Sequence, residues 1–197
     1  MKFSSRQIAL MGMLITLNVA VGGLVHILKL PVYLDAIGTI LAAMLLGLLP
    51  AILVGVLSFL IAAAVISPVF IWFTGTQAVI AIFIYVAASK FGALKSLPRA
   101  IATGLVLGVT TGIVSAPIIV GVFGGVAGSG RDLVTAALLG TGQQIYKAVL
   151  LSGAASEPFD KLLQVLAAFF ILRALPSKVL EPLRNPRLER NGLLKNA

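Results

Sequence analysis

Long apolar stretches, separated by short polar segments, run through most of this chain of 197 residues. Because a helix needs about 20 apolar residues to cross the hydrocarbon core of a bilayer, the pattern predicts six transmembrane helices. We place them at residues 7–28, 36–49, 51–66, 70–89, 98–122 and 159–175. Proline cannot continue a helix beyond its first turn, and it marks several of these limits: Pro31, Pro50, Pro68 and Pro176. The expected fold is an all-α, polytopic membrane protein.

Residues 123–158 are the ambiguous stretch. Leu, Val and Ala between residues 132 and 152 favour another helix, but the run GTGQQ at residues 140–144 interrupts them and Lys147 follows. An unpaired Lys at mid-membrane costs about 2.5–3.5 kcal/mol on insertion scales. We therefore expect an external capping or re-entrant segment between the fifth and sixth helices. Residues 1–180 then form a single six-helix domain, and residues 181–197 form a short basic cytoplasmic tail.

The charges give this fold an orientation. Eleven of the fifteen Lys and Arg residues fall on the side that holds both termini, at the N-terminus, near residues 90–99 and in the C-terminal tail. The other side receives four: Lys29, Arg131, Lys147 and Lys161, balanced by Asp35, Asp132, Glu157 and Asp160. Cytoplasmic loops accumulate Lys and Arg. Both termini are therefore predicted to be cytoplasmic, with the chain in the plasma membrane of a prokaryote.

Composition narrows the function classes. Hydrophobic residues make up 59% of the chain and charged residues 11%, against about 45–50% and 25% in soluble domains. Because the basic residues sit at helix ends, the net charge of +9 indicates contact with anionic lipid rather than with nucleic acid. The chain has no cysteine and one histidine, His26, which predicts no disulfide and no metal site.

Neither catalysis nor ion coupling has a clear sequence signal. The chain carries no H-E-x-x-H, G-x-S-x-G or Walker A motif, so we do not expect an enzyme. Ion-coupled carriers place ionisable residues near the midplane, whereas the deep polar residues expected here are uncharged. They are Thr16, Asn18, Thr74, Thr76, Gln77, Thr110, Thr111 and Ser115. A membrane subunit powered by a partner is the first hypothesis, and a self-sufficient secondary transporter or channel is the alternative.

Polar and aromatic residues gather near the predicted outer face, where a small-molecule site with aromatic walls and a few polar contacts could form. A place in the aromatic belt is an alternative role for Tyr33 and Trp72, and a solvated helix start is an alternative role for Asp160 and Lys161. The candidate substrate-binding residues are Tyr33, Asp35, Trp72, Gln77, Gln143, Gln144 and Tyr146.

Several stretches resemble the S components of energy-coupling factor (ECF) transporters. They are LDAIGTILAA at residues 34–43, LLG at 45–47, AILVG at 51–55 and EPFDK at 157–161. The resemblance implies a vitamin-binding membrane subunit that docks on a T component carrying two ABC ATPases. ATP is then used by those partner subunits, and no cofactor is expected in this chain.

The family docking pattern is A-x-x-x-A on the first helix, and the resemblance places docking at Ser5, Ala9 and Gly12. Ala9 matches, while Met13 stands where a second Ala is expected. Small residues matter there because helices in lipid associate by close backbone approach.

For the substrate, residues 123–158 are long enough to form a mobile lid with the loop near residues 26–35. Such a lid favours a bulky vitamin such as cobalamin, with pantothenate, a pyridoxal-type vitamin or a queuosine precursor left open.

Overall fold

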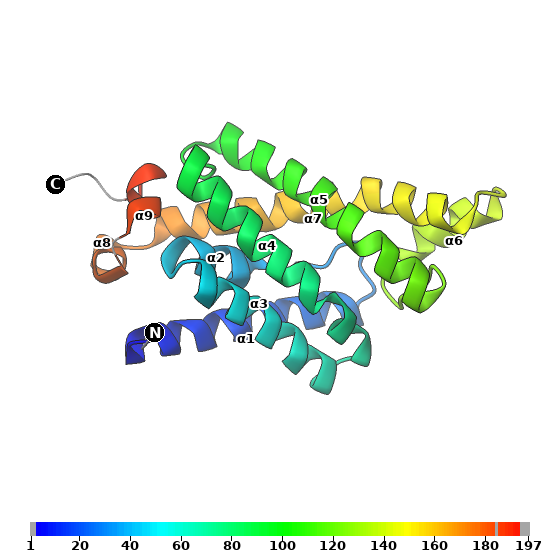
Figure 1. The fold of residues 1–197 in the computed structure, drawn as a ribbon, viewed down its shortest axis with the longest axis horizontal. Helices are drawn as coiled ribbons and strands as arrows, with labels where there is room; N and C mark the ends of the chain where they lie inside the picture. Colours follow the sequence, from blue (N-terminus) through cyan, green and yellow to red (C-terminus); the bar gives the residue numbers. More distant parts are fainter. Residues whose placement is uncertain (1–2, 184, 194–197) are drawn as a thin grey trace.

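The computed structural model describes residues 3–183 and 185–193, and this part of the chain is helical without β-strands. The all-α prediction is confirmed. In chain order (Figure 1) the elements are α1 (Ser5–Ile27), α2 (Ile37–Leu45), α3 (Leu48–Val65), the 3-10 helix η1 (Pro68–Phe73), α4 (Thr74–Val86), the π-helical turn η2 (Ala87–Phe91), α5 (Leu97–Phe123), α6 (Asp132–Gly140), α7 (Ile145–Ala174), α8 (Ser177–Leu180), η3 (Glu181–Leu183) and α9 (Pro186–Arg190).

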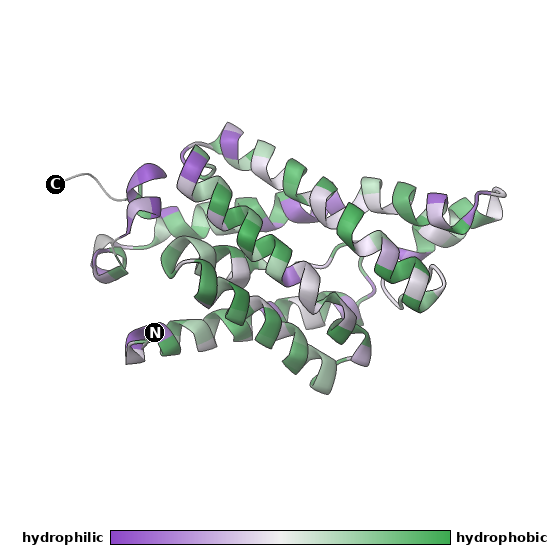
Figure 2. Ribbon diagram, viewed as in Figure 1, coloured by the Kyte–Doolittle hydropathy of each residue, from purple (hydrophilic) through white to green (hydrophobic). Residues whose placement is uncertain are grey.

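Four helical segments of the described chain are long and apolar enough to cross a membrane. They are Ser5–Ile27, Leu48–Val65, Pro68–Phe91 and Leu97–Phe123, and they match the first, third, fourth and fifth predicted spans. Figure 2 shows hydrophobic residues along these helices and hydrophilic ones gathered toward the ends of the molecule. The other two predicted spans differ. At a rise of 1.5 Å per residue, α2 is only about 14 Å long, and α7 carries charged residues at its middle.

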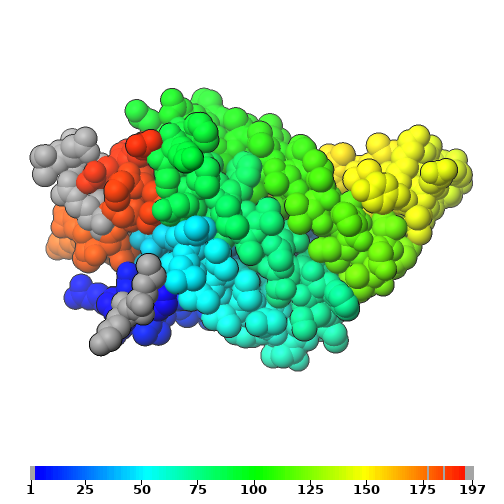
Figure 3. Space-filling model, in the orientation of Figure 1, coloured from blue at the N-terminus to red at the C-terminus, as the bar shows by residue number. Residues whose placement is uncertain are grey.

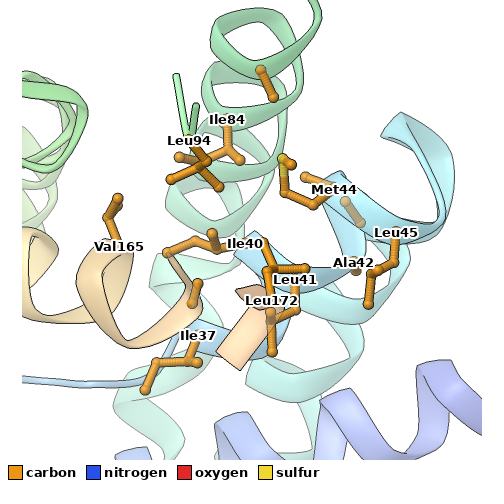
Figure 4. Packing of buried hydrophobic residues seen from close by; sticks show 14 of the residues in the cluster. Ile37, Ile40, Leu41, Ala42, Met44, Leu45, Ile84, Leu94, Val165 and Leu172 are labelled. Atoms are coloured by element: carbon orange, nitrogen blue, oxygen red, sulfur yellow. The ribbon is translucent and has the colours of Figure 1, made fainter. Parts of the chain in front are cut away.

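The short helix α2 is the centre of the core. All nine of its residues are buried, and it packs against α1, α3, α4 and α7. Figure 4 shows side chains of α2, among them Ile40, Leu41 and Met44, meeting Ile84 of α4 and Leu172 of α7. A helix that is apolar on every face is stable only where it is covered on every face. The central position of α2 also fixes the loop before it, residues 28–36.

Helices α5 and α7 have the most extensive contact in the fold. Three glycines four residues apart, Gly104, Gly108 and Gly112, lie on the buried face of α5. A Cβ atom at Gly104 would lie 2.7 Å from the Leu162 Cα atom, and one at Gly108 would overlap the backbone of Pro158. Backbones that approach this closely in lipid require small residues. The contact brings the charged segment of α7 against α5.

Residues 123–158, which were predicted to form a capping segment, are divided mostly between α6 and the first part of α7. Helix α6 ends at Gly140, and α7 begins at Ile145 and continues unbroken to Ala174, so the last helix does not begin at residue 159. Pro158 is tolerated inside α7 because the α5 glycines leave room for its backbone. The hairpin of α6 and α7 projects beyond the other helices (Figure 3).

The described part of the C-terminal segment is not a loose polar tail. Leu188 is fully buried. The Asn191 side chain accepts a hydrogen bond from the Leu94 amide at 2.6 Å and donates one to the Ala88 carbonyl at 3.1 Å. Residue 184 and residues 194–197, which belong to the predicted tail, lie outside the described residues. Helix α9 and the start of α1 lie at the same end of the molecule (Figure 1).

Candidate ligand-binding site

A cavity of about 80 Å³ lies among α1, α3, α4, α5 and α7. Two loops also contribute to its walls, residues 28–36 after α1 and residues 124–131 after α5. These loops contact each other, since the Lys29 ammonium donates a hydrogen bond to the Gly128 carbonyl. The cavity has an apolar wall and a polar wall. Its apolar side chains include Phe59, Val69, Phe70, Phe73, Ile80 and Ile119, and its polar ones include His26, Tyr33, Asp35, Thr76, Gln77, Ser115, Glu157 and Lys161.

Aromatic rings form the apolar wall. The ring of Phe70 lies edge-on to Phe59 at a centroid distance of 5.3 Å and tilted to His26 at 5.2 Å. Phe73 stacks on Phe123 at 6.0 Å. The 3-10 helix η1, which starts at Pro68, supplies two of these rings. Aromatic faces of this kind can stack against a planar ligand.

The polar wall depends on Asp160, which is fully buried on α7. One oxygen of its carboxylate accepts hydrogen bonds from the backbone amides of Tyr33 and Leu34, at 2.8 and 3.0 Å. The other oxygen accepts from Lys161 at 2.5 Å and from the Gln164 side-chain amide at 2.8 Å. Asp160 therefore holds the first loop against α7 and has no acceptor position left for a ligand.

Arg131 anchors the second loop. Its side chain is 1% exposed and ion-pairs with Glu157 at 3.4 Å. It also donates to the Ser152 hydroxyl at 3.1 Å and to the Val149 carbonyl. A Cβ atom at Gly153 would lie 2.6 Å from the guanidinium, so the glycine leaves room for it. Buried charges are stable only when they are paired and hydrogen-bonded, and this arrangement meets that requirement.

Asp35 is different from the other buried acids. It is 8% exposed, and its Oδ1 atom has no hydrogen-bond partner among the described residues. The nearest cation is the Lys161 ammonium at 3.9 Å. Burial raises the pKa of Asp35 to about 6 against the opposing effect of Lys161, and Asp160 and Glu157 raise it further. Thr76 also carries a buried hydroxyl without a partner among the described residues.

A chain of polar side chains fixes the backbone beside this carboxylate. Asn18 donates to the Thr39 hydroxyl at 3.0 Å, and Thr39 donates to the Gln77 carbonyl oxygen at 2.8 Å. The Gln77 amide in turn donates to the Asp35 carbonyl at 3.3 Å. These contacts connect α1, α2 and α4. Gln77 consequently positions Asp35 as well as lining the cavity.

The structure brings together three of the seven predicted substrate-binding residues. Tyr33, Asp35 and Gln77 line the cavity, while Trp72 is 54% exposed on η1 and lies outside its lining. The other three lie at the turn between α6 and α7 and are also outside the lining: Gln143, Gln144 and Tyr146. They are separated from the cavity because α7 is continuous from Ile145 and carries the turn out with the projecting hairpin.

The candidate substrate-binding residues left out four residues of the buried polar cluster: Arg131, Glu157, Asp160 and Lys161. These charged residues are buried inside the protein, so the alternative of a solvated helix start at residues 160–161 is wrong. The available signal was the spacing of Glu157, Lys161 and Gln164 along α7. Residues three and four apart share a helix face, and a polar stripe in an apolar helix requires polar partners inside the protein.

The predicted docking residues lie on the surface of α1. Ser5, Ala9 and Gly12 are exposed, and a Cβ atom at Gly12 would meet nothing within 4 Å. Large apolar side chains flank them, including Met13 at 68% exposure. The helix therefore presents a face with small residues that the described chain does not cover.

Comparison with protein-family models, curated proteins and solved structures finds no match to this chain. The resemblance to S components therefore rests on the sequence stretches given above. Among the described residues, no three or more His, Cys, Asp or Glu side chains form a group that could hold a metal ion. The cavity and its buried charges are the strongest basis for a function.

Proposed function

We propose that this chain is the substrate-capture subunit of an ECF-type importer for a vitamin or related micronutrient. The observation that carries the proposal is the cavity beside two loops that are hydrogen-bonded to each other. Aromatic rings form one of its walls, and the other holds the Asp35 oxygen that has no hydrogen-bond partner among the described residues. A mostly apolar pocket with a few placed polar groups is typical of small-molecule sites.

The proposal includes a six-span topology in which α2 and α7 complete the bundle. Both termini are cytoplasmic, and the α6–α7 hairpin is the external capping segment. Two observations support this arrangement: α9 and the start of α1 share one end of the molecule, and Arg190 of α9 donates to the Lys90 carbonyl at that end. The resulting cluster of basic residues is what the cytoplasmic side of a membrane protein accumulates.

Energy comes from partners in this proposal. A T component docks on the exposed face of α1 that carries Ser5, Ala9 and Gly12, and two ABC ATPases bound to it hydrolyse ATP. The exposed small residues support close packing of a partner helix. No cofactor is assigned to the chain itself.

The cavity volume favours a substrate smaller than cobalamin. Cobalamin was expected because residues 123–158 could form a long lid, but α6 and α7 take up most of that stretch and leave the loop at residues 124–131. A volume of about 80 Å³ is matched better by a vitamin with one or two small rings, such as a pyridoxal-type vitamin. A corrin ring requires both loops to move apart.

The alternative function is a self-sufficient secondary transporter. One observation favours it: Glu157, Asp160 and Lys161 are buried in the middle of a long helix, where ion-coupled carriers place their ionisable residues.

Reconstitution in vesicles separates the two functions. The chain alone should bind its substrate at the cavity but accumulate none inside vesicles, with or without a proton or sodium gradient. Co-reconstitution with a T component and two ABC ATPases should give uptake that needs ATP. Gradient-driven uptake by the chain alone would refute the capture function and establish the carrier.

A further inference from the structure

Resting on the proposed capture function, we infer that the ligand of this cavity is a small planar cation that donates N–H hydrogen bonds to the Asp35 carboxylate. The inference concerns the charge and shape of the substrate. It draws on three independent features of the site: its charge balance, its unpaired acceptors and its aromatic wall.

The buried charges do not balance. Among the described residues, the cluster at the cavity contains three carboxylates, Asp35, Glu157 and Asp160, and two cations, Arg131 and Lys161. Each cation is bonded more closely to another acid than to Asp35, since Arg131 pairs with Glu157 and Lys161 bonds Asp160 at 2.5 Å. Asp35 is left with a cation at 3.9 Å. A buried carboxylate without a full partner is costly, and a cationic ligand supplies the missing charge.

The unpaired atoms line the space where a ligand would sit. Asp35 Oδ1 and Thr76 Oγ1 are buried without hydrogen-bond partners among the described residues, and both residues line the cavity. The backbone of Asp35 is held in place, because its carbonyl accepts from Gln77, and Gly22 leaves room for its side chain, since a Cβ atom at Gly22 would lie 2.7 Å from the Asp35 Cβ atom. An acceptor fixed before binding loses little freedom when the ligand arrives. A ligand with N–H groups satisfies both atoms.

The aromatic wall favours a flat cation over an aliphatic one. Rings of Phe59, Phe70 and Phe73 line the cavity, and aromatic faces attract a cation within about 6 Å. An anionic ligand would meet like charge from Asp35 and Glu157, which both line the cavity. The chemistry that fits is a nitrogen heterocycle that carries a protonated aminomethyl group, or a cationic heterocycle that carries an amino group.

A protonated, neutral Asp35 is the competing explanation for the missing partner of its carboxyl group. Burial raises the pKa of this carboxyl to about 6, so at pH 7.5 most Asp35 side chains are ionised and lack a full partner. A cation then binds to a charge that is already present. The competing account predicts instead that ligand charge does not matter.

A charge-graded ligand panel at pH 7.5 tests the inference on the purified full-length chain in detergent. The cations are thiamine, pyridoxamine and 3-(aminomethyl)pyridine; the neutral compounds are pyridoxine, riboflavin and nicotinamide; the anions are pantothenate, biotin and nicotinate. Thermal stability selects binders and calorimetric titration gives their affinities. The strongest binder should be a cation. Among the three monosubstituted pyridines, affinity should fall from amine to amide to acid.

Two variants localise the effect. Asp35→Asn should weaken the best cation ten- to hundredfold, and Thr76→Val should weaken it several-fold. Glu181→Gln makes the same charge change at an exposed residue of the C-terminal segment and should leave affinity unchanged. If Asp35→Asn does not fold, the affinity order of the three pyridines on the unmodified chain decides the question.

The outcomes separate the inference from the function beneath it. If a neutral or anionic compound binds best and Asp35→Asn leaves its affinity intact, the charge assignment is overturned while substrate capture stands. If no compound of any charge binds, the capture function itself fails.

Discussion

Replacing Arg131 and Glu157 together should destabilise the fold about as much as replacing either one alone. The two side chains are 1% and 5% exposed and connect the loop after α5 to the middle of α7. Arg131→Met keeps an unbranched apolar stem but removes the guanidinium, its charge and its bonds to Ser152 and Val149. Glu157→Gln keeps the shape and leaves an oxygen that can accept from Thr111, now 2.9 Å away.

The expected magnitudes follow from what each variant leaves unpaired. Removing one partner of a buried ion pair costs about 3–5 kcal/mol, because the other charge stays buried. In Arg131→Met the remaining Glu157 still has Lys161 at 3.8 Å, so we expect the lower end, about 3 kcal/mol. Glu157→Gln should cost a similar amount by stranding Arg131. The double variant strands neither charge and should cost about 3 kcal/mol rather than about 6, since the coupling between the sites offsets the second loss.

Unfolding in SDS, followed by the loss of helical circular dichroism, measures these free energies for the unmodified chain and the three variants. Lys147→Met is the matched control, because Lys147 is an exposed cation of α7 and its loss should change stability by less than about 0.5 kcal/mol. Additive costs in the double variant would show that Arg131 and Glu157 do not interact in the bilayer-competent fold. Such a result would refute the pairing of buried charges on which the proposed site depends.

Three further predictions address packing, docking and pH. Gly108→Ala should destabilise the fold by about 1–3 kcal/mol in the same assay, because its Cβ atom overlaps the α7 backbone; Gly121→Ala, in open space on the same helix, should not. Ala9→Trp should weaken co-purification with a T component and leave ligand affinity intact, and the reverse pattern would place docking on another face. Since the pKa of Asp35 is raised to about 6, its ionised form is lost as pH falls from 7.5 to 5. The affinity for a cation should therefore fall over this range in the unmodified chain and much less in Asp35→Asn. Any remaining change there comes from other groups of the site: His26, Tyr33, Glu157 and Lys161 also line the cavity, and Arg131 and Asp160 are paired with two of them.

The apolar pattern predicted most of the helices because each apolar residue marks a position that is buried in lipid or in the core. The predicted span at residues 98–122 corresponds to Leu97–Phe123, where Pro98 suits a first turn. The predicted spans at residues 36–49 and 51–66 leave only Pro50 between them, but the turn between α2 and α3 lies at Gly47 rather than at Pro50. Gly47 adopts a φ of +109°, which glycine alone takes readily, whereas proline is tolerated inside the first turn of a helix.

The start of α7 could not be predicted by the same pattern, whereas its end at Ala174 lies one residue from the predicted limit at residue 175. Glu157, Pro158, Asp160 and Lys161 look like a boundary when they are read locally. Their place inside a helix depends on groups distant in sequence, since Gly108 leaves room for the proline and residues of two loops pair with the charges. Contacts between residues far apart in the chain decide this helix, and no window of local hydropathy contains them.

The charge balance of the cavity shows most directly why the site needs three dimensions. Eight charged residues were assigned to the outer side, four basic and four acidic, and their neutral sum indicates only that a strongly anionic ligand is not favoured. The fold sorts these residues by burial: Lys29 and Lys147 are exposed and Asp132 is half-buried, while the remaining five are buried. Those five are the three acids and two bases of the cluster. A set that is neutral along the sequence is therefore negative in the buried cluster beside the cavity, and the proposed preference for a cation rests on that sorting.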